Sequence, residues 1–160
     1  MILAWVAGLA LLSLLFQDQL QSRFNPNTEL PERVGPDGMQ QVVLERNARG
    51  HYVADGAIND VVVTFLIDTG ATDVAIPEAL ADRLLLERKA GGITQTANGP
   101  VAVWQTLLHR VRLGPIELNN VRAAIVPSMG PGDPVLLGMS FLRQLEFSQR
   151  NGRLTLRRAG

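Results

Sequence analysis

The sequence predicts a small all-β domain with one or two short helices, preceded by an N-terminal membrane-spanning helix. Three observations lead to this fold class. Residues 1–16 are an uncharged apolar run, residues 17–40 are rich in turn-forming residues, and the remainder alternates short β-type runs with turns. We therefore expect a transmembrane anchor at residues 1–17, a flexible linker at residues 18–40 and one folded domain at residues 41–160.

The length and charge of the chain limit its size and its partners. It has 160 residues, with 15 basic and 15 acidic side chains, so its formal net charge is zero. Proteins that bind nucleic acid draw much of their affinity from cationic side chains that neutralise phosphates, so nucleic acid is not expected as a partner. The chain contains no cysteine, which excludes a disulfide framework, a cysteine zinc site and a thiol nucleophile.

The apolar N-terminal run is expected to be an uncleaved membrane anchor. As a helix its 16 residues span about 24 Å, against a hydrocarbon core of roughly 30 Å. A secretory signal peptide is the nearest alternative, but no Lys or Arg precedes the run and Gln17-Asp18-Gln19 offers no small-x-small cleavage site. A buried core helix is disfavoured because the run is apolar on every face and lies at the N-terminus beside a polar linker.

Residues 17–40 are expected to act as a tether. Their prolines, glycines and asparagines break helices and strands alike and bury little surface. These residues are Asn25, Pro26, Asn27, Pro31, Gly35, Pro36 and Gly38. We therefore expect a tether rather than a further domain.

Short strands fill the predicted folded domain. Val42 and Leu44 alternate with polar neighbours, and the run Val61–Ile67 has an apolar residue at every second position before it reaches Asp68. Further strands are predicted at His51–Ala54, Ile93–Ala97, Val101–Leu108, Val111–Leu113, Ile116–Leu118 and Val121–Val126. The pattern is typical of a strand-rich domain with little helix.

Turn and helix signals divide these strands. Asparagine followed by glycine favours a two-residue hairpin turn, and this pair occurs at Asn98-Gly99 and at Asn151-Gly152. One helix is predicted near Pro77–Arg88, because proline suits the first helical position and Glu78 lies where the helix dipole favours an anion. Two hairpins and one helix are therefore expected in fixed order along the chain.

One motif carries a candidate chemistry. Asp68-Thr69-Gly70 places a carboxylate directly after an apolar strand, where a charge is costly to bury. An ordinary turn is the simplest alternative, because these three residue types are common turn formers. A second apolar run, Val135–Gly138, ends in glycine before Met139–Leu142, and the Asn98-Gly99 hairpin lies between the two runs.

In this order of elements the sequence resembles the retropepsin-like aspartic proteases. Their half-molecule carries a hydrophobic-Asp-Thr-Gly-Ala motif, a flap hairpin, and two apolar residues with a glycine before a short helix. The resemblance covers residues 42–158, and Thr96–Gly99 and Leu136–Leu142 look like the membrane-anchored, single-domain members found in bacteria. The resemblance implies the half-barrel fold of an acid protease.

The resemblance also implies a mechanism that needs two carboxyl groups. One takes a proton from water, and the other donates a proton to the carbonyl of the bond that is cut. Two carboxyls a few ångströms apart cannot both ionise, so such a pair shares one proton. The chain has one such motif and is too short for two lobes, so the second group is expected from another copy, with the two Asp68 residues on a two-fold axis.

By resemblance the catalytic residues are Asp68, Thr69 and Gly70. Thr69 would hydrogen-bond across the two-fold axis, and Gly70 would offer an amide donor close to the carboxylates. Ile93–Val103 would be the flap that closes over an extended peptide. The residues expected to bind substrate are Ala71, Thr96, Ala97, Asn98, Gly99, Leu137 and Gly138. A side chain at Gly138 would crowd the aspartate loop; no metal ion and no cofactor are expected.

Other residues that could carry chemistry have structural explanations. His51 and His109 lack the spacing of metal ligands. The stretch Gly138–Leu142 resembles a nucleophile elbow but lacks its second glycine, so Ser140 is expected near a helix N-terminus. Asp73 is expected in a turn or a cap rather than beside a metal ion.

These observations together predict a membrane-anchored, homodimeric aspartic endopeptidase that hydrolyses peptide bonds of protein or peptide substrates. The water would be activated by the paired Asp68 carboxylates. The alternative is a catalytically inactive module of the same fold that binds peptides or dimerises at the membrane, because a fold does not dictate a function. By analogy with the bacterial proteins, the chain is expected to cross the cell membrane once and to hold its protease domain in the periplasm.

Overall fold

The computed structural model of the chain describes residues 5–6, 11–12, 21–35, 38–96 and 99–158. The strands are β1 (Arg33–Val34), β2 (Gln40–Glu45), β3 (Val53–Ile58), β4 (Val61–Ile67), β5 (Val74–Pro77), β6 (Ile93–Thr96), β7 (Gly99–Ala102), β8 (Trp104–Leu113), β9 (Ile116–Val126), β10 (Val135–Leu137), β11 (Leu145–Arg150) and β12 (Arg153–Arg158). Within the described part of the domain, α2 (Glu78–Arg83) and α3 (Met139–Leu142) are helices, and residues 21–24 form a helical turn. The predicted strand-rich domain with one or two short helices is confirmed.

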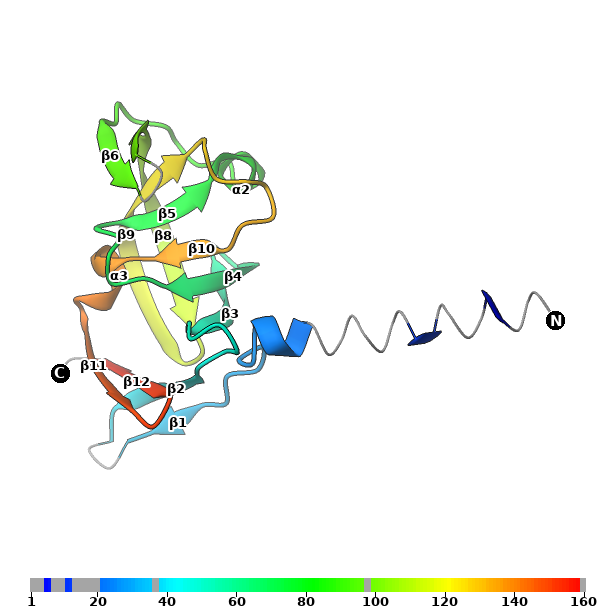
Figure 1. Cartoon of the computed structure of the whole chain (residues 1–160). Coiled ribbons are helices and arrows are strands. Elements are labelled where there is room, and N and C mark those ends of the chain that lie inside the picture. The colour runs from blue at the N-terminus through cyan, green and yellow to red at the C-terminus, as the bar shows by residue number, and fades with distance from the viewer. Residues whose placement is uncertain (1–4, 7–10, 13–20, 36–37, 97–98, 159–160) are drawn as a thin grey trace.

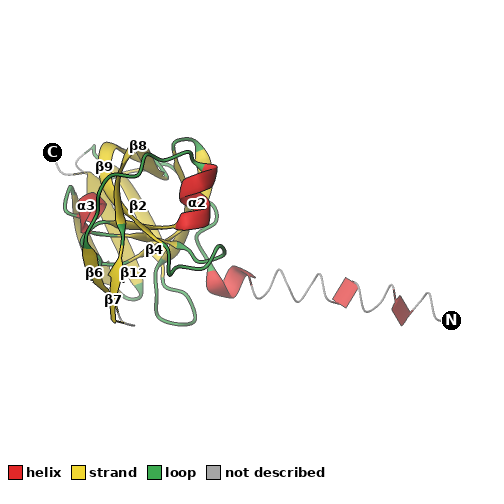
Figure 2. Cartoon of the chain, turned by 90° about the horizontal axis from the view of Figure 1, so that it is seen from above, coloured by secondary structure: helices red, strands yellow, loops and turns green. Residues whose placement is uncertain are grey.

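A closed barrel forms the body of the domain (Figure 1). Its strand order is β10-β4-β3-β8-β9-β5. Most neighbours are antiparallel, but β10 runs parallel to β4 and β5 runs parallel to β9. Seen from above, α2 and α3 lie on opposite sides of the strands (Figure 2). Closure pairs most strand edges of the barrel with a neighbouring strand, and paired edges are not available to other chains.

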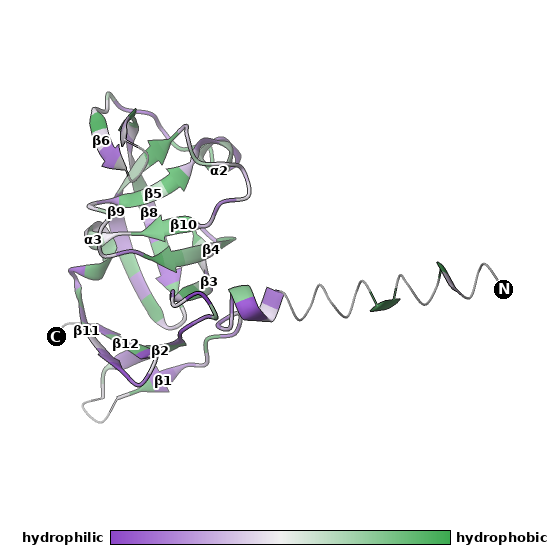
Figure 3. Cartoon of the chain, in the orientation of Figure 1, coloured by the Kyte–Doolittle hydropathy of each residue, from purple (hydrophilic) through white to green (hydrophobic). Residues whose placement is uncertain are grey.

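The barrel interior follows from the alternation of apolar residues. Along β4 the side chains of Val63 and Phe65 are buried, whereas that of Val62 is 70% exposed. Hydrophobic residues concentrate on β4, β5 and β10, and hydrophilic ones line β11 (Figure 3). The largest fully buried side chains are Phe65, Phe141, Leu44, Ile58, Ile76, Leu108, Leu113, Ile116, Ile125, Leu137, Leu142 and Leu156. Their burial supplies most of the driving force for folding.

A second sheet joins the two ends of the domain in the order β1-β2-β12-β11. Its C-terminal hairpin turns at Asn151 and Gly152, which have φ values of 50° and 74°. Positive φ at both central residues is the requirement of the two-residue turn that an Asn-Gly pair favours. The hairpin predicted at this position is confirmed.

Two long strands replace the predicted short ones in the middle of the chain. Val111–Leu113 is the end of β8, and the two runs predicted after it merge into β9. Asn120, which lies between the two predicted runs, takes a φ of 54° inside β9, and pairing continues on both sides of it. Asparagine tolerates this conformation at low cost, so the local signal for a turn does not end the strand.

The helix near Pro77 is shorter than predicted. It was expected to extend to Arg88, but α2 ends at Arg83 and Leu85 adopts a φ of 52°. This left-handed residue leaves Leu85 itself 90% exposed and lets Leu86, which is 9% exposed, pack against the core. Tertiary packing therefore overrides the helix pattern at this end.

The predicted tether is wrong for residues 25–27, which are docked on the domain, and for Arg33–Val34, which pair with β2 as β1. Asn27 is 4% exposed, and its side-chain amide donates to the carbonyls of Glu45, at 2.9 Å, and Val53, at 2.7 Å. Its side-chain oxygen accepts the N–H of Glu45 at 2.7 Å. Asn25, which is 2% exposed, donates to Asp55 at 2.8 Å. Polar side chains thus stabilise a segment that has little apolar surface to bury.

Replacing Asn27 by alanine is expected to lower the free energy of unfolding by about 2–4 kcal/mol, because the buried carbonyl of Val53 and the part-buried backbone groups of Glu45 lose their partners. Chemical denaturation monitored by tryptophan fluorescence measures the change. Asn119→Ala is the matched control, since the Asn119 side chain is exposed on β9. Equal stability of the two variants contradicts the docking of this segment.

The predicted anchor at residues 1–17 lies almost wholly outside the described residues. Trp5, Val6, Leu11 and Leu12 are described there, and each is more than half exposed. Within the described part of the chain, no helix is both long and apolar enough to cross a membrane. The anchor remains a prediction.

Candidate active site

Asp68 lies where β4 leaves the barrel. The N–H of the last strand residue, Ile67, donates to the Tyr52 carbonyl at 2.9 Å. The N–H of Asp68 donates on the other side, to the Leu137 carbonyl of β10, at 3.2 Å. Bonds to both neighbouring strands fix the backbone at the point where the carboxylate leaves the sheet. The Asp68 residue is half-buried.

Residues 68–73, here called the Asp68 loop, turn sharply after the strand. Gly70 donates its N–H to the Asp68 carboxylate at 2.8 Å, so the backbone orients one carboxylate oxygen. A Cβ atom at Gly70 would lie 3.1 Å from that oxygen, which is a tight contact. Thr69 and Gly70 are exposed, and Ala71 is half-buried. The predicted amide donor at Gly70 is confirmed, and the loop presents its polar tip outward.

The short helix α3 holds the Asp68 loop from behind. Its first two N–H groups donate to loop carbonyls, Met139 to Ala71 at 2.8 Å and Ser140 to Thr72 at 2.9 Å. Gly138 makes this approach possible, because a Cβ atom there would lie 2.3 Å from the Asp73 carbonyl oxygen and 2.7 Å from that of Ala71. The predicted need for glycine at position 138 is confirmed.

Ser140 is a structural residue rather than a nucleophile. It is 3% exposed, and its hydroxyl accepts the N–H of Val74 at 3.0 Å and donates to the Arg122 carbonyl at 2.7 Å. The residue therefore ties α3 to β5 and β9. Its predicted place near a helix N-terminus is confirmed, but its partners lie too far along the sequence to be predicted.

Asp73 does not join Asp68 in a shared site. Its carboxylate pairs with the Arg122 guanidinium at 3.1 Å. Asp68, by contrast, forms no ion pair within the described part of the chain, which leaves its charge available. Among the described residues no three His, Cys, Asp or Glu side chains are arranged to hold a metal ion.

The segment predicted to act as a flap forms a separate two-stranded sheet. β6 and β7 pair from Ile93 with Ala102 to Thr96 with Gly99, and the hairpin projects from one end of the barrel (Figure 1). Gly99 lies in β7 with a φ of 105° rather than in the turn, so the predicted turn at Asn98-Gly99 is wrong by one residue. Ala97 and Asn98 lie outside the described residues.

The base of the hairpin is attached to the barrel by backbone contacts. Val103 donates its N–H to the Gly92 carbonyl at 2.9 Å, and Lys89 and Gln105 exchange two further bonds. Val103 is buried, whereas Ile93 is 77% exposed. One long hairpin up to Leu108 was predicted, but the chain breaks at Val103 and enters the barrel as β8. The projecting part is thus short, and Val101 of β7 packs against the cluster of Val103, Ala124 and Val126.

The structure groups the predicted site residues into two sets. Asp68, Thr69, Gly70 and Ala71 form one continuous loop, against which Leu137 and Gly138 pack through β10 and α3. Thr96 and Gly99 belong to the separate hairpin. A single chain therefore supplies the Asp68 carboxylate, the support of its loop by β10 and α3, and the β6–β7 hairpin.

Comparison with protein families identifies this arrangement. Residues 54–144 match the family described as gag-polyprotein putative aspartyl protease, which is more than half of the chain. The chain belongs to this aspartyl protease family. The match runs from β3 through the Asp68 loop and the β6–β7 hairpin to α3.

The sequence similarity of this aspartyl protease family member to two curated relatives extends over most of the chain. An uncharacterised protein in the cobV 5′ region of Sinorhizobium sp. is 34% identical over 125 residues, covering 76% of this chain and 53% of the relative. An uncharacterised protein of Rickettsia prowazekii (strain Madrid E) is 29% identical over 109 residues, covering 66% and 46%. The chain spans about half the length of the curated relatives it matches.

A solved structure supports the same assignment. The crystal structure of a retropepsin-like aspartic protease from Rickettsia conorii is similar, with a TM-score of 0.64 and 28% sequence identity. The similarity covers 81% of this chain and 96% of the other. The predicted retropepsin-like fold is confirmed.

Proposed function

We propose that the chain is a membrane-anchored, homodimeric aspartic endopeptidase that cuts protein or peptide substrates. The observation that carries this proposal is the Asp68 loop of an aspartyl protease family member, in which the Gly70 N–H orients an aspartate that forms no ion pair within the described residues. Thr69, Gly70 and Ala71 complete the motif.

The proposed chemistry needs one ionised and one protonated Asp68. The ionised carboxylate removes a proton from water while the water oxygen attacks the carbonyl carbon of the peptide bond. The protonated carboxyl donates its proton to the carbonyl oxygen, which gives a neutral tetrahedral intermediate. A proton then passes from the aspartate that accepted it to the amide nitrogen, while a hydroxyl of the intermediate returns its proton to the other aspartate. The C–N bond breaks to give a carboxylic acid and an amine, and the pair again shares one proton.

The outward position of the loop supports a dimer. Asp68 is half-buried in one chain, and Thr69, Gly70 and Thr72 are exposed around it. A second copy placed on a two-fold axis would bring an identical loop against this one, so each copy would supply one carboxyl. The Thr69 hydroxyl would then donate a hydrogen bond across the two-fold axis.

Two further surfaces fit an extended substrate. The β6–β7 hairpin would close over the peptide as a flap. The exposed side chain of Ile93 and the backbone of the Thr96–Gly99 pair would face the peptide. Ala71, Leu137 and Gly138 would form the floor beneath the peptide. Ala97 and Asn98 complete the proposed substrate-binding set.

The location of the chain is part of the proposal. The apolar run at residues 1–16 would cross the cell membrane once, with the protease domain in the periplasm. The helical turn at residues 21–24, which follows this run, lies on the side of the barrel opposite α3 (Figures 1 and 2). The Asp68 loop, which contacts α3, would therefore face away from the anchor.

A digest of a peptide library by the full chain in detergent micelles tests this function. We expect cleavage at internal bonds, inhibition by a statine-type transition-state analogue, and specific activity that falls on dilution as the dimer dissociates. Mass spectrometry of the products identifies the cut bonds. Absence of cleavage at every pH from acid to neutral contradicts the proposal and favours the non-catalytic module.

A further inference from the structure

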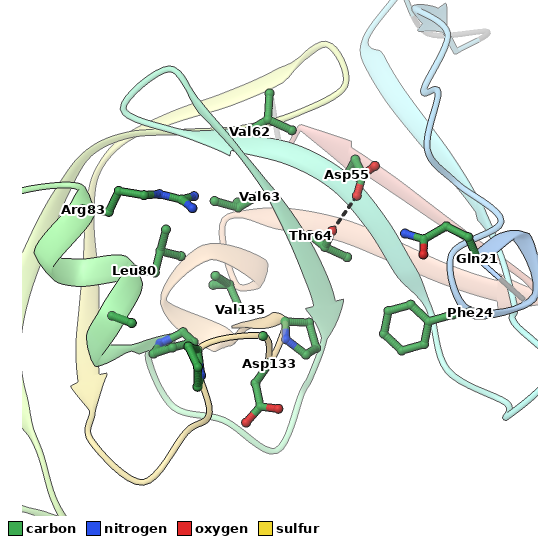
Figure 4. A pocket seen from close by; sticks show the side chains of 15 residues that line it. Gln21, Phe24, Asp55, Val62, Val63, Thr64, Leu80, Arg83, Asp133 and Val135 are labelled. Carbon is green, nitrogen blue, oxygen red and sulfur yellow. Dashed lines mark hydrogen bonds between the residues drawn. The ribbon is translucent and has the colours of Figure 1, made fainter. Parts of the chain in front are cut away.

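A cavity opens at the end of β4 that lies away from the Asp68 loop (Figure 4). Its volume is about 590 Å³, within the range of roughly 300–1,000 Å³ that is typical of ligand sites. β4, α2, the turn at residues 131–134 and the helical turn at residues 21–24 contribute its walls. Val62 lies six residues before Asp68, so the two are roughly 20 Å apart along the strand. We call this space the β4 cavity.

The direction of the backbone groups of β4 follows from two hydrogen bonds. Ile67 directs its N–H to Tyr52, on the β3 side, and Asp68 directs its N–H to Leu137, on the β10 side. Backbone groups of successive strand residues alternate between the two neighbouring strands. The even-numbered residues of β4 therefore direct their N–H and C=O groups toward the side on which β10 lies.

β10 covers only part of that side. It begins at Val135, which pairs with Phe65, so nothing in β10 lies opposite the first four residues of β4. The backbone N–H and C=O of Val62 and the N–H of Thr64 are directed to this open side, and within the described residues they have no hydrogen-bond partner. Val62, Val63 and Thr64 also line the β4 cavity. The cavity thus contains an unpaired strand edge.

The side chains around this edge combine apolar walls with one available cation. Phe24, Leu80 and Val135 contribute apolar surface. Arg83 points from α2 toward β4 in Figure 4 and forms no ion pair within the described part of the chain. The acidic residues of α2, Glu78 and Asp82, pair with Arg88 rather than with Arg83.

The two carboxylates that line the cavity accept hydrogen bonds from neighbouring residues. Asp55 accepts hydrogen bonds from the Thr64 hydroxyl and from the Asn25 amide, each at 2.8 Å. Asp133 accepts the N–H of Gly130 at 2.7 Å. Because neither carboxylate forms an ion pair with Arg83, the guanidinium can bind a carboxylate that a ligand brings.

We infer that the β4 cavity binds an extended peptide segment of another protein that carries an acidic residue. The segment adds as a strand to the open edge of β4, where it pairs with Val62 and Thr64. Its apolar side chains contact Phe24 and Leu80, and its carboxylate binds Arg83. This site is separate from the Asp68 loop and does not require hydrolysis.

Binding of heptapeptides to the full chain in detergent micelles tests the inference. The probes carry a central glutamate, lysine or alanine between mixtures of Val, Ile, Thr and Ser, and fluorescence anisotropy reports binding. All chains carry Asp68→Asn so that the probes are not cut. We expect saturable binding of the glutamate series, at least about tenfold tighter than that of the lysine series, because opposite and like charges then meet Arg83.

Two substitutions separate the strand edge from the charge. Arg83→Glu is expected to weaken binding of the glutamate series about tenfold and to favour the lysine series, while Arg112→Glu, at an exposed position on β8, has no effect. Val62→Pro removes an N–H that no described residue accepts, so we expect it to abolish binding without altering the melting temperature.

A third measurement does not depend on the folding of any variant. In a chain labelled with ¹⁵N-valine and ¹⁵N-threonine, the glutamate series is expected to slow hydrogen exchange at Val62 and Thr64, since both N–H groups then donate to the peptide. No saturable binding of any probe series overturns the inference. Binding that Arg83→Glu leaves unchanged, or that protects neither amide, also overturns it.

Discussion

Asp68→Asn is expected to lower the rate of peptide hydrolysis by about 10²–10⁴-fold, which is the usual contribution of a general acid or base. The side chain keeps its size, and its amide oxygen can still accept the Gly70 N–H that the carboxylate accepts at 2.8 Å. The loop should therefore keep its shape, while the amide can neither take a proton from water nor donate one as a carboxyl does. Single-turnover kinetics on one cleaved peptide measure the loss.

Asp60→Asn is the matched control for this substitution. Asp60 is an exposed aspartate that pairs with Arg110 near the turn between β3 and β4, and exposed pairs contribute little to stability. We expect activity close to that of the unchanged chain. Equal losses in the two variants, or hydrolysis that survives Asp68→Asn, contradict the proposed role of Asp68.

Mixing the two forms of the chain tests whether two copies share one site. Because each proposed site needs an Asp68 from both protomers, a mixed dimer should be inactive. Excess Asp68→Asn chain, allowed to exchange subunits, should then suppress the hydrolysis by the unchanged chain in proportion to the mixed dimers formed. Activity that is indifferent to the added chain contradicts a shared site.

The parts of the fold that local patterns determine could be predicted from the sequence. In β4 the alternation of apolar residues determines both the strand and the burial of Val63 and Phe65. At Asn151-Gly152 the residue types themselves suit positive φ. The candidate site was likewise predicted where chemistry is concentrated in one short motif, as it is in Asp68 with Gly70.

The parts that depend on distant partners could not be predicted. Asn27 stands in a stretch typical of a tether, and only its contacts with Glu45 and Val53 reveal that it is docked. The β4 cavity depends on β10 beginning opposite Phe65, which is a matter of strand register. Local patterns contain neither kind of information, because side-chain partners and register are decided by the packed structure.

Gly138→Ala is expected to lower the free energy of unfolding by about 3 kcal/mol, at the upper end of the usual cost of overpacking. The new Cβ atom would lie 2.3 Å from the Asp73 carbonyl oxygen and 2.7 Å from that of Ala71, and both are backbone atoms that cannot rotate away. A melting temperature lower by roughly 10 °C follows for a domain of this size. Differential scanning calorimetry measures it.

The same substitution should reduce hydrolysis by more than the loss of stability explains. The atom it contacts at Ala71 is the carbonyl oxygen that accepts the Met139 N–H at 2.8 Å, so relief of the clash displaces the Asp68 loop from α3. A displacement of even 1 Å at a catalytic group lowers rates strongly. Assays well below the melting temperature of the variant separate this effect from unfolding.

Gly132→Ala is the control that isolates the contact from the loss of glycine. A Cβ atom at Gly132 meets nothing within 4 Å, and its φ does not fall in the left-handed region. Alanine there restricts the unfolded chain and should leave stability unchanged or raise it by about 0.4–1 kcal/mol. If Gly138→Ala matches Gly132→Ala in both melting temperature and activity, then the packing of Gly138 against the Asp68 loop does not support the site.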